Sequence, residues 1–446
     1  MDLFVYFLLG TVVITHEVVR KKYFKIDLIT IFNLFFFLVY SFAPAALIIG
    51  GNSLILDDMP YGHKYFGHYA FTPYLVFLSY LFFLAGFYTL KFGENTHNWK
   101  FKFWWDEDTI EFILPFAYAL LFFFLFIYVN EVGGLMKTIE LAEAYRSGVL
   151  EYNKFGFVMK FFPLNTILLY YVYYKYFLEK KQNKLLLLYF ILSLLFVVLF
   201  TVIQNSRGFL IFQLAGLYVI TANYHKNLFL KYLIPTLIST FIVIKYGKAF
   251  FNAIQFLFTD GFDAFINAFT GRLNIDAQQG SSIISYFTHP IVSLEATLIR
   301  TGTDIPWRYF RDIKDTFLMI LPNELLGIEE PKMPLMEQNT LILLGQPIQI
   351  VLPGILGYFS YAGHIIGLFL GSYLYGLIGV TLMKFSINMY RSLPASLVYI
   401  FVFSLSYGYF AFRGVPDQIL NDAFMYIVII MFLLFSFKLK LIKVKN

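Results

Sequence analysis

The sequence predicts an all-α polytopic membrane protein with about eleven transmembrane helices and one large loop on the outer side. Two observations lead to this fold class. Hydrophobic residues make up 59% of the 446-residue chain and charged residues only 14%, whereas a soluble domain carries about a quarter charged residues. The apolar residues also form continuous runs of about 18–22 residues, the length that crosses a bilayer as a helix. A barrel is excluded because its strands are short and alternate.

The apolar runs give the expected order of elements. The spans are expected at 2–19, 28–49, 71–91, 109–129, 159–178, 185–203, 208–223, 229–246, 351–383, 395–412 and 418–437. A long polar excursion, 245–350, separates the eighth span from the ninth. No linker divides the chain, so we expect one integral membrane domain over 1–446, with 245–350 as a helical cap within it.

The basic residues indicate how the chain is oriented. More than half of the 34 Lys and Arg residues lie in short connections after alternate spans or in the tail. Arg20 and Lys175 are among them. Short loops rich in Lys and Arg stay on the cytoplasmic side. The N-terminus is therefore expected outside and the C-terminus inside.

The segment 351–383 is too long for one straight span of about 20 residues. Gly363, Gly367 and Gly371 recur in it at four-residue spacing. Small residues at this spacing form a groove into which another helix backbone packs. The second interpretation is a seam that lines a path for lipid or glycan. Pro353 is expected to break the outer end of the segment.

Two arginines lie in short turns on the outer side. Arg207 follows Ser206 and precedes Gly208 at the start of a helix, where open backbone N–H groups favour an anion. The alternative is an interfacial anchor whose charged head reaches water. Arg413 lies between the last two expected spans, and Asp417 is near enough in sequence to pair with it.

The arginines of the large loop are expected to act singly. Acidic residues outnumber basic ones in 245–350, so a general anion-binding surface is not supported. Arg308 and Arg311 each have an aspartate four residues later, which also suits a solvated helix with ion pairs. Arg300 ends an apolar stretch, and Arg272 has no acidic residue within three positions. The partner of Arg272 must therefore come from elsewhere in the fold or from a ligand.

Glu295 and His289 are the candidate bases. Glu295 lies in the moderately apolar stretch 290–298, where desolvation raises the pKa of a carboxyl and suits it to general-base work. The alternative is a carboxylate bonded to a nearby arginine. His289, before Pro290, is the second candidate.

Several classes of site have no support in the sequence. The chain has no cysteine, so disulfides and thiolate metal sites are excluded. No cluster of residues has metal-ligand spacing, and no phosphate-binding glycine loop follows a strand. We therefore expect no metal, no cofactor and no nucleic-acid partner.

Taken in order, these features resemble the bacterial oligosaccharide-repeat-unit polymerases, the Wzy-type polymerases of O-antigen, enterobacterial common antigen and capsule. The resemblance lies in the polar turn 204–208 with its arginine, the apolar run that ends at Pro322, the glycine-rich span after the loop, and Arg413-Gly414. It covers most of the chain in order and spacing.

The resemblance implies a glycosyltransferase of the C-type membrane superfamily in the bacterial inner membrane. Such an enzyme transfers a growing glycan from undecaprenyl pyrophosphate to the non-reducing end of a lipid-linked repeat unit at the periplasmic face. Its implied partners are the lipid-linked donor and acceptor, membrane lipids, a chain-length regulator and a flippase. The pyrophosphate-binding role falls on Arg207, Arg272 and Arg413, and then on Arg300, Arg308 and Arg311. Arg272 also joins Glu295 and His289 among the implied catalytic residues.

Two alternatives stay open. An O-antigen ligase belongs to the same superfamily and uses lipid A core as acceptor, with a conspicuous histidine in the large loop; here that residue is His289. A flippase or another transporter of lipid-linked glycan is the non-enzyme alternative. Transporters carry internal repeats and charged residues deep within spans, and the sequence shows neither.

Overall fold

The computed structural model describes residues 2–51, 64–90, 107–146, 156–204, 207–225, 229–278, 283–303, 305–318, 334–345, 351–392 and 406–416. These residues are almost entirely helical and include no strand. The helices, in chain order, are α1 (Asp2–Val19), α2 (Leu28–Phe37), η1 (Leu38–Phe42), α3 (Ala43–Gly50), α4 (Thr72–Thr89), α5 (Glu107–Val132), α6 (Leu135–Glu140), α7 (Ala142–Arg146), η4 (Gly156–Phe161), α8 (Leu164–Tyr173), η5 (Tyr174–Leu178), α9 (Lys184–Ile203), α10 (Arg207–Tyr224), α11 (Phe229–Thr259), α12 (Phe262–Gln278), α13 (Ile283–Arg300), α14 (Arg311–Leu318), α16 (Leu335–Leu344) and α17 (Gly354–Ser392).

Among the described residues, six helices are long and apolar enough to cross a membrane, or up to seven if the bent α11 counts as one span. The six are Asp2–Val19, Leu28–Gly50, Thr72–Thr89, Glu111–Val132, Lys184–Ile203 and Gly354–Tyr390. They coincide with six of the spans expected from the apolar runs. The all-helical fold class is thus confirmed, and these apolar helices are consistent with a membrane protein. The expected span 418–437 and most of 395–412 lie outside the described residues.

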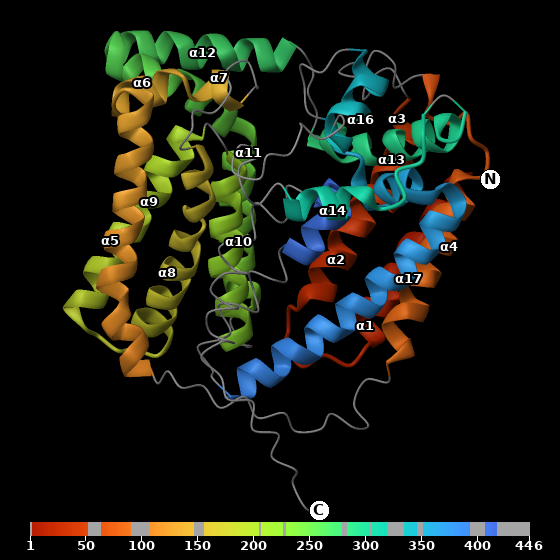
Figure 1. Ribbon diagram of the computed structural model, residues 1–446, viewed down its shortest axis with the longest axis horizontal. Coiled ribbons are helices and arrows are strands. Elements are labelled where there is room, and N and C mark those ends of the chain that lie inside the picture. The colour runs from red at the N-terminus through yellow and green to blue at the C-terminus, as the bar shows by residue number, and fades with distance from the viewer. Residues whose placement is uncertain are drawn as a thin grey trace, which may run out of the picture.

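The helices form two groups that stand side by side (Figure 1). One group contains α5, α8, α9, α10 and α11, with α12, α6 and α7 at its upper end. The other contains α1, α2, α4 and α17, with α13 and α16 near the same upper end. Helix α10 joins the groups, because the side chain of Asn223 exchanges hydrogen bonds of 3.0 and 2.8 Å with the backbone of Ile26. The cap expected in 245–350 therefore divides between both groups.

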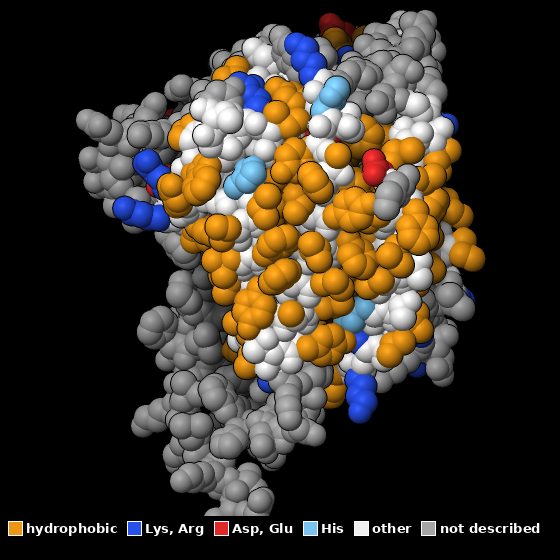
Figure 2. All heavy atoms as spheres, turned by 90° about the vertical axis from the view of Figure 1, so that its right-hand side faces the viewer, with side chains coloured by type: hydrophobic (Ala, Val, Ile, Leu, Met, Phe, Trp, Pro, Cys, Tyr) orange, Lys and Arg blue, Asp and Glu red, His pale blue; other side chains and the backbone are white. Residues whose placement is uncertain are grey.

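The outer surface of the second group is strongly apolar. Figure 2 shows one broad field of hydrophobic side chains over this face, with Lys and Arg near its upper and lower margins. Helices α1, α4 and α17 carry exposed hydrophobic side chains, among them Phe4, Phe7, Leu78, Phe82, Ile366, Leu370 and Leu374. A continuous apolar band bordered by charge is what the hydrocarbon core of a bilayer requires.

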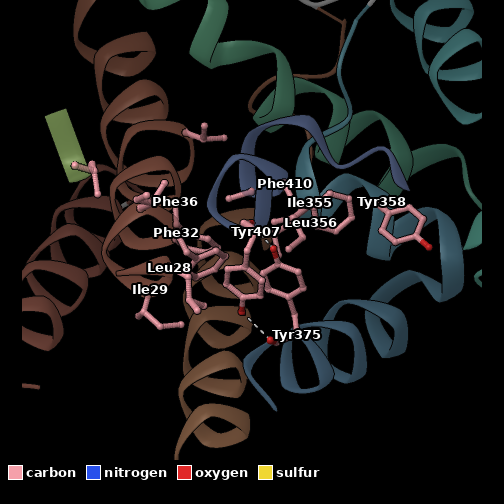
Figure 3. Packing of buried hydrophobic residues seen from close by; sticks show 14 of the residues in the cluster. Leu28, Ile29, Phe32, Phe36, Ile355, Leu356, Tyr358, Tyr375, Tyr407 and Phe410 are labelled. Carbon is pink, nitrogen blue, oxygen red and sulfur yellow. Dashed lines mark hydrogen bonds between the residues drawn. The ribbon is translucent and has the colours of Figure 1, made fainter. Parts of the chain in front are cut away.

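The core of this group is aromatic. Phe32 of α2 stacks on Phe83 of α4 at 4.2 Å between ring centroids. Tyr375 of α17 stacks on Tyr407 at 4.3 Å, and the hydroxyl of Tyr407 donates to the carbonyl of Tyr375 at 2.7 Å (Figure 3). The Tyr375 hydroxyl donates in return to the carbonyl of Tyr407. The hydroxyls of Tyr375 and Tyr407 thus each have a partner, as an interior without water requires.

Helices α4 and α17 cross with their backbones in direct contact. A Cβ on Gly376 would lie 2.1 Å from the Phe83 carbonyl oxygen, and one on Gly86 would lie 1.9 Å from the Tyr373 carbonyl oxygen. Only glycine permits this approach from both sides. The crossing fixes the long half of α17 against α4, within the second group.

The prediction that Gly363, Gly367 and Gly371 form a groove for another helix is wrong. Helix α17 breaks at Gly363 and His364, where the backbone leaves helical geometry. Cβ atoms on Gly367 and Gly371 would meet Phe359, which belongs to the first half of the same helix. The glycines therefore allow α17 to fold back closely on itself, and the break lies ten residues beyond Pro353.

Two basic residues expected in exposed cytoplasmic connections are buried. The Arg20 guanidinium donates to both carboxylate oxygens of Asp27, at 2.8 and 2.6 Å, and to Glu17 at 2.9 Å. Lys175 lies within η5 and donates to Glu179 at 2.7 Å. Charges this deeply buried need such partners. Arg20 follows the first span as expected, whereas Lys175 lies within η5 and not in the connection after the fifth span.

Candidate functional site

Helix α13 is the element that positions the candidate site. It packs on α17, α3 and α16, although it is not one of the candidate spans. Its residues 290–298 are buried, and Ile291, Val292 and Ala296 are completely so. A helix that is covered on nearly all sides holds its polar side chains in fixed places. His289, Glu295 and Arg300 all lie on this helix.

Glu295 is the buried carboxyl of the site. Glu295 is only 2% exposed, and its Oε2 accepts a hydrogen bond of 2.6 Å from the backbone N–H of Gly67. Burial raises the pKa of Glu295 from 4.5 to about 7, although hydrogen bonds from Gly67, Thr72 and the His68 backbone oppose the shift. Gly67 itself is exposed. The carboxyl therefore lies just beneath the surface and changes its charge near neutral pH.

Arg300 contacts the same connection, 64–71, that covers Glu295. Its Nη1 donates to the hydroxyl of Tyr65 at 3.3 Å. Phe66, between these two contacts, is buried in the hydrophobic core. Helix α13 thus holds the connection between α3 and α4 through two side chains, the carboxyl of Glu295 and the guanidinium of Arg300.

His289 lies two turns before Glu295 on α13 and is half-buried. Burial lowers the pKa of His289 to about 4, so its imidazole is neutral at pH 7. Phe287, on the preceding turn, packs against Phe412 at 5.7 Å between ring centroids. The start of α13 therefore lies beside the segment that carries Arg413.

Arg413 lies over the ring of Tyr409, with its Cζ 4.6 Å from the ring centroid. This cation–π contact holds the guanidinium in place. The next residue, Gly414, has a φ of +63° and approaches the backbone of Gly354, where a Cβ would lie 2.0 Å from the carbonyl oxygen. Close backbone packing thus fixes Arg413 at the start of α17. Asp417, its expected partner, lies outside the described residues.

A short segment between α13 and α14 crosses the break in α17. The backbone N–H groups of Arg308 and Tyr309 donate to the carbonyls of Tyr361 and Ala362, each at 2.9 Å. His364 has a φ of +53°, and its Nε2 donates to the carbonyl of Leu298 at 2.9 Å. A non-glycine residue in the left-handed region costs about 1–3 kcal/mol and persists only where the surroundings enforce it.

The i,i+4 pairs predicted on the loop helix are confirmed. Arg308 donates from Nε to both carboxylate oxygens of Asp312 at 2.9 Å, and from Nη1 to Gln338 at 2.6 Å. Arg311 pairs with Asp315 at 3.2 Å on the exposed surface. Arg308 is therefore bound within the fold, whereas the Arg311 pair faces solvent.

Arg207 and Arg272 belong to the other group of helices. Arg207 is the first residue of α10, and α10 approaches the Arg413 segment where Phe212 packs on Tyr409 at 4.9 Å between centroids. Arg272 is half-buried in α12, which packs on α11 through Phe265 and Phe250. The structure thus places His289, Glu295, Arg300 and Arg413 around α13 and leaves Arg272 on a different helix pair.

Sequence reasoning missed the residues that complete this arrangement. Tyr65 and Gly67 lie more than 200 positions from their partners on α13, and no local pattern connects them. His364 and Gln338 also escaped notice. The glycine before His364 was the one available signal, and it was assigned to helix packing.

Among the described residues, no group of three or more His, Asp or Glu side chains is placed to hold a metal ion. No family model matches the chain, and comparison with curated proteins and with solved structures finds no match. The chemistry of the site must therefore be argued from a buried carboxyl, a neutral imidazole and arginines at the upper end of the spans.

Proposed function

We propose that the protein is a polysaccharide polymerase that transfers a growing glycan from undecaprenyl pyrophosphate to the non-reducing end of a lipid-linked repeat unit. Glu295 supports this most directly, because a carboxyl with a pKa near 7 suits a base that removes a proton from a sugar hydroxyl. It lies on the same helix as Arg300, and α13 stands toward the upper end of its helix group (Figure 1), where a lipid-linked substrate would arrive from the bilayer surface.

The transfer is a substitution at the anomeric carbon of the donor. A hydroxyl oxygen of the acceptor forms the new bond to this carbon as the bond to the pyrophosphate oxygen breaks. The pyrophosphate leaves with the electron pair, and the hydroxyl proton passes to Glu295. Guanidinium groups stabilise the charge on the leaving group through bidentate contacts. Arg413 and Arg300 are best placed for this, with Arg207 at the start of the neighbouring α10.

The proposal includes the finer architecture. We place about eleven spans in the bacterial inner membrane, with a C-type glycosyltransferase arrangement, a periplasmic N-terminus and a cytoplasmic C-terminus. Helices α12, α13, α14 and α16 then lie at the periplasmic face. The apolar helices and the position of α12, α13 and α16 toward one end of the molecule (Figure 1) are consistent with this orientation.

The decisive experiment replaces single arginines in a strain that lacks its own copy of the gene. Changing Arg207, Arg300 or Arg413 to Ala is expected to lower the transfer rate about 10²–10³-fold, because each removes an electrostatic donor. Surface glycan should then consist of single repeat units, seen as loss of the ladder on a gel. Lys314 is an exposed basic residue of α14 and serves as the control.

The activity of the Glu295 variant gives a second test. Glu295→Gln keeps the shape and the acceptor oxygen for Gly67 but cannot take a proton at neutral pH. Polymerisation should fall about 10²–10⁴-fold, while Glu337→Gln on the exposed face of α16 leaves the ladder unchanged. A normal ladder from Glu295→Gln and from all three arginine variants would sink the proposal.

One observation favours transport of lipid-linked glycan as a second candidate. Buried His16, Asn33 and Tyr80 hydrogen-bond to one another between α1, α2 and α4, with Tyr80 hydroxyl distances of 3.0 Å to His16 Nδ1 and to Asn33 Oδ1. Polar groups buried among spans often mark a substrate or ion path. A transporter would lose all surface glycan on Asn33→Leu and tolerate Arg413→Ala, whereas a polymerase would retain single units in the second case.

A further inference from the structure

Trp307 and Tyr309 form an exposed aromatic pair on the segment between α13 and α14. Trp307 is 41% exposed and Tyr309 is 71% exposed. Their ring centroids lie 5.7 Å apart, with an angle of 60° between the ring planes. Large aromatic rings this exposed, outside the candidate spans, contribute little to the hydrophobic core. Their position therefore calls for a reason other than packing.

The Trp307 side chain is fixed by the turn that ends α13. Gly302 has a φ of +88°, and its backbone N–H donates to the carbonyl of Ile305 at 2.8 Å. A Cβ on Gly302 would lie 2.7 Å from the Trp307 Nε1 atom, so the indole rests directly on the glycine backbone. Ile305 is buried and anchors the turn. The indole is thus held in position while part of its surface faces outward.

The Tyr309 side chain is held outward by a constrained backbone. Tyr309 and Phe310 have φ values of +47° and +57°, in the region that favours glycine. The Tyr309 N–H bond to the Ala362 carbonyl maintains this conformation. Phe310 turns inward and packs on Tyr358 at 5.9 Å between ring centroids. The segment therefore buries one ring and presents the next one to solvent, and the chain retains the strain that this requires.

We infer that Trp307 and Tyr309 are a stacking platform for sugar rings of the acceptor glycan. The inference rests on the proposed polymerase function and adds a binding site to it. The C–H faces of a pyranose pack on aromatic rings, while its hydroxyls need polar partners nearby. Arg311 and Asp315 supply charged groups on the adjoining α14. Only a short turn separates Trp307 from Arg300, so the platform adjoins the end of the helix that carries Glu295.

The same charges argue against lipid as the occupant. A ring that anchors a protein in a bilayer lies at the level of the headgroups, next to apolar surface. Helix α14, which follows the pair directly, is instead rich in charged residues, with Arg311, Asp312, Lys314 and Asp315 among its eight. Burial in acyl chains is therefore disfavoured, and a hydrated ligand is favoured.

Intrinsic fluorescence tests the platform directly. The chain has four tryptophans, so a variant with Trp99, Trp104 and Trp105 changed to Phe reports on Trp307 alone. The purified protein in nanodiscs is titrated with soluble oligosaccharides of one to five repeat units, released from the native polymer by mild acid. We expect a saturable change in Trp307 emission. Tyr309→Ala should raise the apparent Kd about 3- to 10-fold in this background.

A second set of variants removes the reporter itself. Binding is then followed by calorimetry, in which Trp307→Ala should raise the Kd about 3- to 10-fold and Trp307→Phe by less. Phe262→Ala on α12, also a strongly exposed ring at 65%, is the matched control. Thermal unfolding curves that match the wild type exclude loss of fold.

Three outcomes would overturn the platform. In the first, the wild-type protein does not bind the oligosaccharide. In the second, both alanine variants keep the wild-type affinity. In the third, lipids with brominated acyl chains strongly quench the fluorescence of Trp307. The last result would identify a membrane anchor. Ladder formation is scored separately in the same strains. A normal ladder from the wild type together with unchanged affinity of the variants would reject the platform and leave the polymerase proposal intact.

Discussion

Glu295→Gln should remove a measurable part of the pH dependence of stability. Burial raises the pKa of Glu295 from 4.5 to about 7, so the folded protein binds this proton more tightly than the unfolded chain does. One pKa unit corresponds to about 1.36 kcal/mol. The protonated carboxyl therefore gives a stability advantage of about 3 kcal/mol that is fully present below pH 4.5 and is lost as the pH rises through about 7.

The glutamine variant is neutral at every pH and keeps an oxygen that accepts the Gly67 N–H. Its Tm, measured in nanodiscs by intrinsic fluorescence from pH 4.5 to 8.5, should therefore fall less with pH than the Tm of the wild type. Above pH 7.5 the variant should be the more stable protein. Glu337→Gln, on an exposed position of α16, should follow the wild type. Parallel curves for the wild type and Glu295→Gln would refute the raised pKa and with it the reason for choosing this base.

Two further predictions concern stability. Gly376→Ala should lower the free energy of unfolding by about 1–3 kcal/mol, because its Cβ would lie 2.1 Å from the Phe83 carbonyl oxygen. Gly363→Ala is the control, because a Cβ there meets no atom within 4 Å. Equal Tm values for the two variants would contradict the backbone contact. Arg308→Ala should cost about 3–5 kcal/mol because it leaves a buried carboxylate unpaired. Arg311→Ala at its exposed pair should cost less than about 1 kcal/mol, and denaturation curves that rank the two in the opposite order would refute this assignment.

The membrane helices could be predicted because their signal is local. A helix that crosses hydrocarbon must satisfy its own backbone and present about 20 apolar residues, and both requirements are met within one segment. The six candidate spans therefore begin and end close to the expected limits, as Asp2–Val19 and Lys184–Ile203 illustrate. The i,i+4 pairs of α14 were predictable for the same reason.

The break in α17 could not be predicted, because its cause is tertiary. Proline is the usual local reason for a broken helix. Pro353 therefore led us to expect the break at the outer end of the segment 351–383. The observed break at Gly363 and His364 is held by bonds from distant segments, including the Tyr309 N–H and the Leu298 carbonyl. No pattern of four-residue spacing carries that information.

The site was predicted in part. The apolar surroundings of Glu295 correctly indicated its burial and raised pKa. They also suggested an arginine as its partner, whereas the hydrogen bond that the structure gives comes from the backbone of Gly67. The roles of the arginines stay predictions. The resemblance ranked Arg272 before Arg300, whereas the fold places Arg300 on α13 with Glu295 and Arg272 on α12.

The Gly67 contact explains how a buried base can still meet its substrate. Gly67 is exposed and Glu295 lies directly beneath it. The N–H of Gly67 stabilises the carboxylate, so its hydrogen bond lowers the pKa that burial raises. An acceptor hydroxyl that takes the place of this N–H must displace the connection 64–71. Loss of the Gly67 hydrogen bond, which lowers the pKa of Glu295, would leave burial to raise that pKa further. In the proposed reaction, displacement of the connection 64–71 would therefore couple acceptor binding to exposure of the base.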